Sequence, residues 1–553
     1  MSGRRRGLAR RAGLPGTGRP GTALLRAGRL RAGLLALACA TLLIGTGHAS
    51  AATLSSRAAQ DRSWTVYHYD AAGSGVVTSV TAVRTSTRAW TSPSLDGQIY
   101  GVPLVSSGRV YVATENDTVY ALSAATGAVV WSRHLGTAVP AGSLPCGDIS
   151  PAVGITGTPV IDQPRHEIFV VADELVGGKP AHLLIGLSAG SGKSELTQDV
   201  DPAGANPAAL LQRTGLTLDA GRVVFGFGGN YGDCATYQGR LVAVPETGGT
   251  PDVFTVDAAP GESQGAIWMG GAAPAVDSSG HLWVSAGNGS VHSSGHAYDD
   301  SDSVLELSPA LRLLQFFAPG NWALNNAADL DMSTQPVLLS DGQVMLTGKS
   351  RIVYLLDGAH LGGIGGQQAT LGGVCSSDID GGGAVVGTTA YLPCLSGIIA
   401  VQAARSPASL RLLWSSGTGG GPPIMAAGLI WTIGQNGTLY GLDPATGKVA
   451  QQASIGAAAS HFPTPSVADG LLLAPAANQV VAFAASGHGA PVTASPVPAP
   501  GAAGPARSPG PARAAGGGGI PAGAVAGIAL AAVVVVGGTG WLLWRRRAGG
   551  SSS

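Results

Sequence analysis

The sequence predicts an all-β fold made of repeated hairpins set around an axis, and three observations support this prediction. The phrase VYALSAATGAVVW at residues 119–131 returns as LYGLDPATGKV at residues 439–449. Partial copies lie between them, at residues 184–193, 241–249 and 398–406. Glycine accounts for 86 of the 553 residues and aromatic residues for only 5%, as expected of a turn-rich β protein. Strand–turn–strand units that recur at intervals of roughly 40–60 residues are typical of radial β arrays.

Prolines divide the chain into similar units. Six of them precede a short apolar run and a turn, at the start of a strand, where proline removes no donor from the sheet. Two further units, beginning near Leu216 and Gly383, fit without a proline, which makes eight. The last unit has too few strands, and residues 87–93 can supply its outer strand. We therefore predict an eight-bladed β-propeller, with seven blades as the fallback, whose ring is closed by an N-terminal strand. The six prolines are Pro103, Pro159, Pro274, Pro336, Pro423 and Pro465.

The N-terminal end carries an export signal. The first 31 residues contain nine Arg and no acidic residue, and an apolar run follows at residues 33–46. Ala49-Ser50-Ala51 then fits a small-residue cleavage site. This order of charged region, apolar region and cleavage site predicts a signal peptide over residues 1–51.

The C-terminal end carries an anchoring signal. Residues 520–544 form an uncharged run of 25 residues, followed at once by Arg545, Arg546 and Arg547. At 1.5 Å per residue such a run spans about 37 Å, so we predict a transmembrane helix. The positive-inside rule then makes residues 545–553 a cytoplasmic tail. Residues 486–519, rich in Pro, Ala, Gly and Ser, are expected to form a semi-extended linker.

The remaining residues, 52–485, are expected to form an extracytoplasmic propeller attached to the cell membrane. They hold all 32 acidic residues of the chain and 18 of its basic residues, so their net charge is near −14. This charge argues against nucleic acid or anionic lipid as the main partner of the propeller. The expected partners are the membrane, through the C-terminal helix, and an extracellular protein, glycan or small ligand.

Four cysteines lie in the predicted propeller, and an even number in an exported chain favours disulfides over a metal site. Cys146 and Cys375 fall in connections from an outer strand to the next blade. Cys234 and Cys394 fall in or near connections between middle strands. In a propeller these two kinds of loop lie on the same face. The sequence permits three pairings, and we predict Cys146–Cys234 and Cys375–Cys394.

The better copies of the repeat, with the form ALxAxTGxxxW, resemble the tryptophan-docking repeat of pyrroloquinoline-quinone (PQQ) propellers, the fold of quinoprotein alcohol dehydrogenases. Trp131 stands where the docking tryptophan of that family packs against the neighbouring blade, and Thr126 and Gly127 stand at its turn. The resemblance covers most of residues 62–485. Many proteins with such repeats bind no quinone, including outer-membrane assembly scaffolds, so the resemblance implies the fold more strongly than an activity.

Four residues stand in fragments that resemble the cofactor site of these dehydrogenases. The resemblance implies that Asn288, in SAGNGS, helps to hold calcium and that Asp329, in AADLDMSTQPVL, is the base that takes the alcohol proton. It also implies that Lys349, in GKSRIVYLLD, contacts the quinone carbonyls and that Trp268 stacks on the quinone ring. Carboxylate and amide oxygens are suitable ligands for a hard cation, and a carboxylate nearby can accept a proton as hydride leaves.

The sequence also departs from that family. The adjacent Cys-Cys pair is missing, and the segment that corresponds to WDYD lacks its aromatic residues. The Glu calcium ligand expected in the third unit is not evident, and Asp233 is the nearest carboxylate there. We therefore expect weak affinity for PQQ and calcium, and structural roles remain open for the residues in the matching fragments.

A second polar cluster lies at residues 292–302. Asp299, Asp300 and Asp302, together with His292 and His296, form a loop that could bind calcium or another cation. Their spacing matches no EF-hand, which favours a plain exposed loop.

Two functions from different classes fit these observations. We favour a surface-displayed binding or scaffolding propeller; the alternative is a PQQ- and calcium-dependent dehydrogenase of alcohols or sugars. The enzyme requires Asn288, Asp329, Lys349 and Trp268 to converge around the central channel, with room for a flat cofactor.

Overall fold

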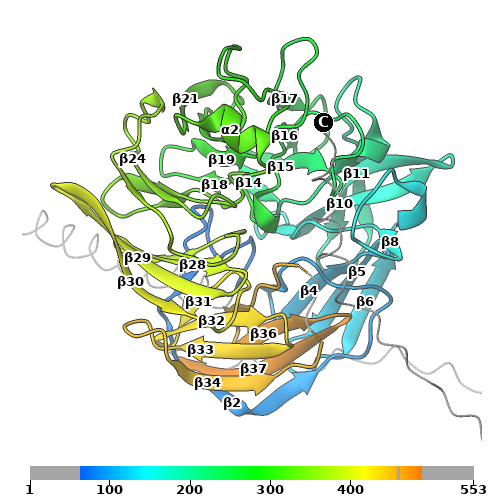
Figure 1. The fold of residues 1–553 in the computed structure, drawn as a ribbon. Coiled ribbons are helices and arrows are strands. Elements are labelled where there is room, and N and C mark those ends of the chain that lie inside the picture. Colours follow the sequence, from blue (N-terminus) through cyan, green and yellow to red (C-terminus); the bar gives the residue numbers. More distant parts are fainter. Residues whose placement is uncertain (1–62, 458–460, 488–553) are drawn as a thin grey trace, which may run out of the picture. The chain divides into compact units, whose positions relative to one another are not determined.

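The computed structural model describes residues 63–457 and 461–487. They belong to one compact unit, Met1–Ala494, in which the strands form eight sheets of four or five strands, arranged as blades around a ring (Figure 1). The predicted signal peptide, membrane helix and tail lie outside the described residues, as does the linker beyond residue 487. In the part of the chain that the structure describes, no helix is long and apolar enough to cross a membrane.

The first four blades each run from an inner strand at the channel to an outer strand at the rim. Blade 1 contains β3 (Leu104–Ser106), β4 (Arg109–Thr114), β5 (Thr118–Ser123) and β6 (Val129–His134). Blade 2 contains β9 (Val160–Asp162), β10 (Glu167–Val176), β11 (Lys179–Ser188) and β12 (Ser194–Asp199). Blade 3 contains β14 (Thr217–Asp219), β15 (Arg222–Gly229), β16 (Arg240–Pro245) and β17 (Asp252–Thr255), and β13 (Leu210–Leu211) also pairs with β15. Blade 4 contains β18 (Ala275–Val276), β19 (Leu282–Ala286), β20 (Ser303–Leu307) and β21 (Leu313–Ala318), with β25 (Gly363–Ile364) at its edge.

The other four blades follow in chain order. Blade 5 contains β22 (Val337–Leu338), β23 (Gln343–Leu346), β24 (Val353–Asp357) and β26 (Ala369–Leu371). Blade 6 contains β27 (Ala384–Val386), β28 (Thr389–Cys394), β29 (Gly397–Arg405) and β30 (Ala408–Ser416). Blade 7 contains β31 (Ile424–Ala426), β32 (Leu429–Gly434), β33 (Thr438–Leu442) and β34 (Val449–Ser454). Blade 8 contains β35 (Ser466–Ala468), β36 (Leu471–Ala476), β37 (Gln479–Gly487) and β2 (Val80–Thr91).

Short elements connect these blades. They are β7 (Val139–Pro140), β8 (Ala152–Val153), the 3-10 turns η1 (Ala141–Ser143), η2 (Pro207–Ala209) and η3 (Met269–Gly271), and the helix α2 (Trp322–Ala327).

The predicted count of eight blades is confirmed. Each of the six prolines immediately precedes the innermost strand of a blade, as Pro103 precedes β3 and Pro465 precedes β35. The two units without a proline also begin where expected, at Thr217 and Ala384. Because an inner strand begins at the central channel, a proline just before it removes no ladder hydrogen bond.

An N-terminal strand closes the ring, as predicted, although it is longer than expected. Strand β2 runs antiparallel to β37 and pairs from Val80 with Gly487 to Thr91 with Val481. The register shifts between Arg84 and Trp90, and such irregularities obscure the alternating pattern by which a strand is recognised in sequence.

Tryptophans join neighbouring blades by a repeated contact. The Trp90 Nε1–H of the closing strand donates to the Ala124 carbonyl of blade 1 at 2.8 Å. The Trp131 Nε1–H of blade 1 donates to the Ala189 carbonyl of blade 2 at 3.2 Å. Gly127, with φ of 71°, stands so close to Trp90 that a Cβ would overlap the indole. The predicted docking role of Trp131 and the turn at Gly127 are therefore confirmed.

The N-terminal segment 63–77 crosses the centre of the ring, which the sequence did not predict. Trp64 and Val105 of blade 1 exchange two backbone hydrogen bonds of 2.8 Å, and Val276 N of blade 4 donates to Ala71 O at 2.7 Å. These contacts lie near the turns that join the first and second strands of each blade. Such turns lie on the face opposite the loops between middle strands and between blades, where the cysteines are. The segment therefore closes the channel on the face opposite the cysteines. The other backbone contacts are Ile161 N to Thr65 O, Val385 N to Ser74 O, and the parallel pairing of β1 (Val76–Val77) with β31.

Both predicted disulfides are present. Cys146 pairs with Cys234 across blades 2 and 3, with Cα atoms 6.2 Å apart. Cys375 pairs with Cys394 at a Cα separation of 6.0 Å. Cys146, Cys234 and Cys375 lie in loops between middle strands or between blades, and Cys394 is the last residue of β28, at the start of such a loop. We call the face that these loops form the disulfide face.

Replacing Trp90 by alanine should destabilise the propeller strongly. The indole is only 9% exposed and joins the closing strand to blade 1, so Trp90→Ala should lower the free energy of unfolding by about 3–5 kcal/mol. Val130→Ala, on the outer strand of blade 1, is a matched control because Val130 is 48% exposed, and it should cost less than about 0.5 kcal/mol. Urea unfolding followed by circular dichroism measures both, and equal losses would contradict the docking role.

Candidate functional site

The predicted site residues come from four loops of the disulfide face. Trp268 lies just before η3, in the connection from blade 3 to blade 4, and Asn288 lies just after β19. Asp329 follows α2, between blades 4 and 5, and Lys349 lies between β23 and β24. All four loops begin or end at strands of adjacent blades, so the propeller places them side by side.

The structure brings these four side chains together. Lys349 Nζ lies 2.9 Å from Asp329 Oδ1, and the same oxygen accepts a 2.8 Å hydrogen bond from Asn288 Nδ2. Lys349 Nζ also lies over the Trp268 ring, 5.8 Å from its centroid. The convergence required for a cofactor site is therefore present, while the role of each residue stays a prediction.

Asp331 is the central carboxylate of this cluster, although sequence reasoning gave it no role. Its Oδ2 lies 2.6 Å from Lys349 Nζ, and its Oδ1 accepts a 2.7 Å hydrogen bond from the backbone N–H of Asn288. Burial works against the charge on Lys349, but Asp331 and then Asp329 outweigh it and raise the pKa of the ammonium above its usual value. Lys349 is thus a permanent cation that is shared by two carboxylates.

Asp233, the other predicted metal ligand, has a different partner. Its Oδ1 accepts a 2.8 Å hydrogen bond from the Tyr237 hydroxyl, and it stands beside Cys234 in the loop after β15. The charges of Asp331 and Lys349 act on it, so it lies near the cluster without being tied to Lys349 by a salt bridge in the described residues.

A row of rings and cations extends the cluster across the disulfide face. Trp268 lies 6.0 Å from Phe462 between ring centroids, and the Arg213 guanidinium lies 5.6 Å from the centroids of both Phe462 and Tyr100. We call Lys349, Trp268, Phe462, Arg213 and Tyr100 the aromatic–cation row.

Sequence reasoning missed Arg213, Phe462 and Tyr100, since no motif surrounds them. Their three loops are separated by more than a hundred residues each in sequence, and only closure of the ring brings them together. The one signal available is position, since each lies a few residues before the inner strand of a blade.

The floor of the site contains a buried carboxyl. Asp380 is 4% exposed, and burial raises its pKa to about 7, although Ser333 and the charge of Lys349 oppose the rise. Next to it, Gly382 N donates to the Tyr67 hydroxyl at 3.1 Å. The crossing segment 63–77 thus reaches the site from below.

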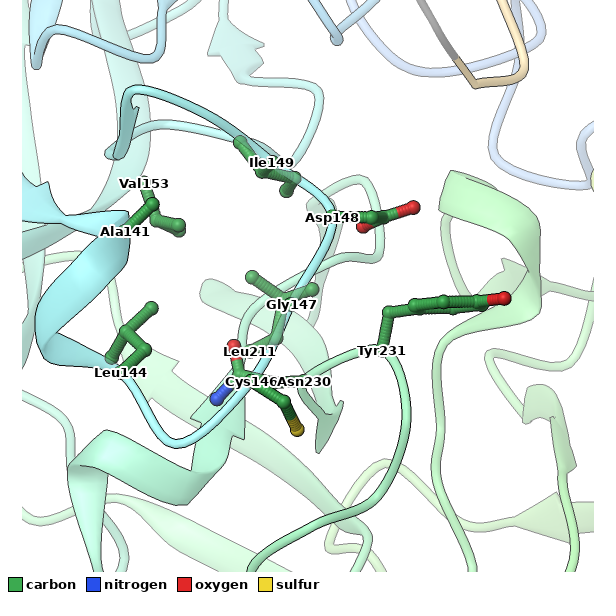
Figure 2. Close-up of a pocket in the computed structure, with 10 residues that line it drawn as sticks. All are labelled: Ala141, Leu144, Cys146, Gly147, Asp148, Ile149, Val153, Leu211, Asn230 and Tyr231. Atoms are coloured by element: carbon green, nitrogen blue, oxygen red, sulfur yellow. The ribbon is translucent and has the colours of Figure 1, made fainter. Parts of the chain in front are cut away.

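A small pocket lies near the site on the same face, beside the Cys146–Cys234 disulfide. Figure 2 shows Leu144 and Ala141 on one side of it and Asp148 and Tyr231 on the other. Asp148 accepts from His461 Nε2 at 2.7 Å, which connects this pocket to the residue before Phe462. The pocket contains none of the four predicted site residues; its lining consists of Ala141, Leu144, Cys146, Gly147, Asp148, Ile149, Val153, Leu211, Asn230 and Tyr231.

The donor set suits a hard cation. Asn288 Oδ1 is buried and has no hydrogen-bond partner, and the Asp329 and Asp331 carboxylates lie beside it. Two carboxylates against one ammonium leave a net negative charge, and oxygen ligands of this kind are those that calcium prefers. For a flat cofactor, Trp268 offers a ring, but Lys349 Nζ already lies over that ring.

Comparisons with known proteins agree with this architecture. A protein family described as "Outer membrane protein assembly factor BamB" matches residues 73–357, more than half of the chain. The chain belongs to this family of PQQ-repeat β-propellers. No curated protein sequence matches the chain significantly.

Several solved structures share the fold at low sequence identity. The quinohemoprotein alcohol dehydrogenase from Comamonas testosteroni superposes with a TM-score of 0.58 and 14% identity, over 77% of this chain and 81% of that one. The quinohemoprotein alcohol dehydrogenase ADHIIG from Pseudomonas putida HK5 superposes with a TM-score of 0.57 and 14% identity, over 80% of this chain and 82% of that one. A europium-containing methanol dehydrogenase superposes with a TM-score of 0.54 and 14% identity, over 75% of this chain and 89% of that one. At such identity the likeness shows the fold alone.

Replacing Asp380 by asparagine should make stability less dependent on pH. The ordinary pKa of 3.8 rises to about 7 in the folded protein, so folding favours the protonated carboxyl. That contribution is fully present below about pH 4 and is lost as pH rises through 7. The free energy of unfolding of Asp380→Asn minus that of the wild type should therefore be about 2–4 kcal/mol larger at pH 8 than at pH 4.

Urea unfolding between roughly pH 4 and pH 8 measures this difference. Glu195→Gln is the control, since Glu195 is an exposed carboxylate on the outer strand of blade 2, and it should follow the wild-type slope because Asp380 is unchanged. If the free energies of unfolding of Asp380→Asn and the wild type differ by the same amount at every pH in this range, folding does not shift the titration of Asp380.

Proposed function

We propose that this chain is an exported, membrane-anchored PQQ-repeat propeller that binds a hydroxyl-rich ligand, such as a sugar or the end of a glycan, on its disulfide face. The apolar run at residues 520–544 and the arginines after it support the anchor, and the signal-like residues 1–51 support export. Residues 486–519, rich in Pro, Ala, Gly and Ser, are the proposed linker between the propeller and the anchor.

One observation carries the binding proposal. The Asp329 side chain is 70% exposed, yet its Oδ1 is held by Lys349 and Asn288, and Lys349 Nζ lies 5.8 Å from the centroid of the half-buried Trp268 ring. The exposed carboxylate offers a hydrogen-bond acceptor, and the part of the Trp268 ring that Lys349 does not cover offers an apolar surface. Hydrogen bonds to charged groups contribute about 1.5–3 kcal/mol, and the fixed carboxylate loses little entropy on binding.

Charge narrows the class of ligand. Asp329 and Asp331 together exceed the single charge of Lys349, and residues 52–485 carry a net charge near −14. An anionic ligand would be repelled unless a cation accompanied it. A neutral ligand whose hydroxyls donate to Asp329, and whose ring faces Trp268, meets no such penalty.

Trp268→Ala should weaken sugar binding at least tenfold. A panel of monosaccharides and oligosaccharides, titrated against the full chain by calorimetry and tryptophan fluorescence, should identify a ligand that the wild type binds with a dissociation constant of about 10⁻⁵–10⁻³ M. Tyr231→Ala is the control, because Tyr231 is a 72% exposed ring on the same face outside the aromatic–cation row. A binding sugar whose affinity is unchanged in Trp268→Ala would contradict the proposed site, and so would the absence of any binding sugar.

A second candidate function is the PQQ- and calcium-dependent oxidation of alcohols or sugars. The convergence of Asn288, Asp329, Lys349 and Trp268, with Asn288 Oδ1 buried and unpartnered, favours it. PQQ, when bound, would supply the hydride acceptor. Asp329 would take the hydroxyl proton on its carboxylate, and Lys349 and Asn288 would orient that carboxylate. Asn288 Oδ1 and Asp331 would hold the cation.

We expect no PQQ-dependent turnover with simple alcohols or aldoses. Lys349 already lies over the Trp268 ring and pairs with both carboxylates, so PQQ would have to displace these contacts on binding. The test is dye-linked oxidation by the full chain with PQQ and calcium, with Asp329→Asn as the comparison. A robust rate that disappears in Asp329→Asn would replace the binding proposal by the enzyme.

A further inference from the structure

The polar loop at residues 292–302, which the sequence suggested was exposed, is buried in part. His292 and His296 are exposed as expected, but Asp299 is 4% and Asp302 0% exposed. The expectation of a plain exposed loop is therefore wrong. Two segments contact this loop: the connection from blade 3 to blade 4, which adds a carboxylate of its own, Asp257, and α2, whose Asn325 Nδ2 donates to Asp302 Oδ2 at 2.6 Å.

Asp257 and Asp299 are buried carboxyls that interact with each other and keep three oxygens to which no other group donates. Asp257 is 0% exposed, and neither of its carboxylate oxygens has a hydrogen-bond partner. Asp299 Oδ2 is also buried and unpartnered, whereas Asp299 Oδ1 accepts from Ser301 N at 3.2 Å and from Ser301 Oγ at 2.6 Å. Three carboxylate oxygens therefore remain buried and unpartnered.

The backbone brings these two carboxylates together. Asp257 N donates to Asp299 O at 3.0 Å, and Gly265 N donates to Asn288 O at 2.7 Å. A Cβ at Gly265 would lie 2.9 Å from Asp257 Oδ2, and one at Gly289 would lie 2.5 Å from Asp299 Oδ2. Both carboxylates thus press against adjacent glycine backbones, where a side chain of any other residue would collide with them.

Such a pair is costly unless something neutralises it. A buried carboxylate without a partner costs several kcal/mol, and in the described residues no Lys, Arg or His forms a salt bridge with Asp257 or Asp299. Burial, and then the charge of Asp299, raise the pKa of Asp257 to about 9. The two ways to relieve this cost are a shared proton and a bound cation.

We propose that Asp257 and Asp299 bind a calcium ion between blades 3 and 4. Hard oxygen ligands from irregular loops suit calcium, which accepts carboxylates together with backbone carbonyls in flexible geometry, whereas magnesium requires a compact octahedron. Two full negative charges in a buried site give the ion its affinity.

This site is separate from the Asn288–Asp331–Lys349 cluster but is coupled to it. Asn288 and Gly289 are adjacent in sequence, and Gly265 N holds the Asn288 carbonyl. A cation on Asp257 and Asp299 therefore fixes the start of the loop that presents Asn288. The ion supports the binding face, and this role does not depend on which ligand that face takes.

Calcium titration of the full chain, stripped with chelator, tests the proposal. The wild type should bind calcium in calorimetry and melt at a higher temperature as calcium rises. Asp257→Asn and Asp299→Asn should each weaken calcium binding at least a hundredfold and abolish this shift. Without calcium, Asp257→Asn should melt no lower than the wild type, because the amide keeps the shape of the side chain and cannot become a buried negative charge. Magnesium at equal concentration should give a smaller shift.

Asp331→Asn locates the ion. It alters the neighbouring cluster and should retain the calcium-dependent shift that Asp257→Asn loses. The proposal is overturned if Asp331→Asn abolishes the shift while Asp257→Asn keeps it, since the ion would then lie beside Lys349. It is equally overturned if the wild type binds no calcium, because a shared proton would then neutralise the pair.

Discussion

The structure depends on residues 63–91, which close the ring in two ways. Residues 63–77 bond to the inner strands of several blades across the channel, and β2 then completes blade 8 beside β37. A propeller without such closure would leave a strand edge open between its first and last blades and inner strands with unpaired backbone groups. Trp90 completes the junction, because it docks the closing strand onto blade 1. The same segment reaches the base of the site through Tyr67. The segment that closes the ring therefore also supports the binding face.

Buried negative charge is the second constraint, and the two carboxylate clusters meet it differently. Asp331 and Asp329 share the ammonium of Lys349, which keeps its proton because of them. Asp257 and Asp299 have no such cation among the described residues, which is why an ion or a proton is required there. Both clusters gather at the blade 4 loops, since the disulfide face brings together connections from adjacent blades. An unpaired buried charge destabilises the fold by more than a hydrogen bond stabilises it. Ligands and ions that neutralise such charges therefore affect the stability of these loops most.

Much of the fold could be predicted because its signals are local. Pro103 and Pro465 mark the first residues of inner strands, and Gly127 marks a turn that only a small residue allows next to Trp90. Loop positions put the four cysteines on one face and left three pairings possible, and the two predicted pairs are the ones present. The candidate site was predicted in part, through the resemblance of short fragments that contain Asn288 and Lys349. The burial of Asp299 was not, because the side chains that cover it come from a loop some forty residues earlier in the chain.

The sequence by itself predicted the blade number, a closing strand near residues 87–93, the docking role of Trp131 through its resemblance to a known repeat, and the loops that form one face, since the signals for each are local. Only the tertiary structure decided that residues 63–77 cross the channel, that Arg213 lies between Phe462 and Tyr100, and that Asp257 meets Asp299. These contacts join segments from different blades. Their geometry is set by closure of the ring. The periodicity and spacing within one segment therefore cannot predict which distant loops come into contact.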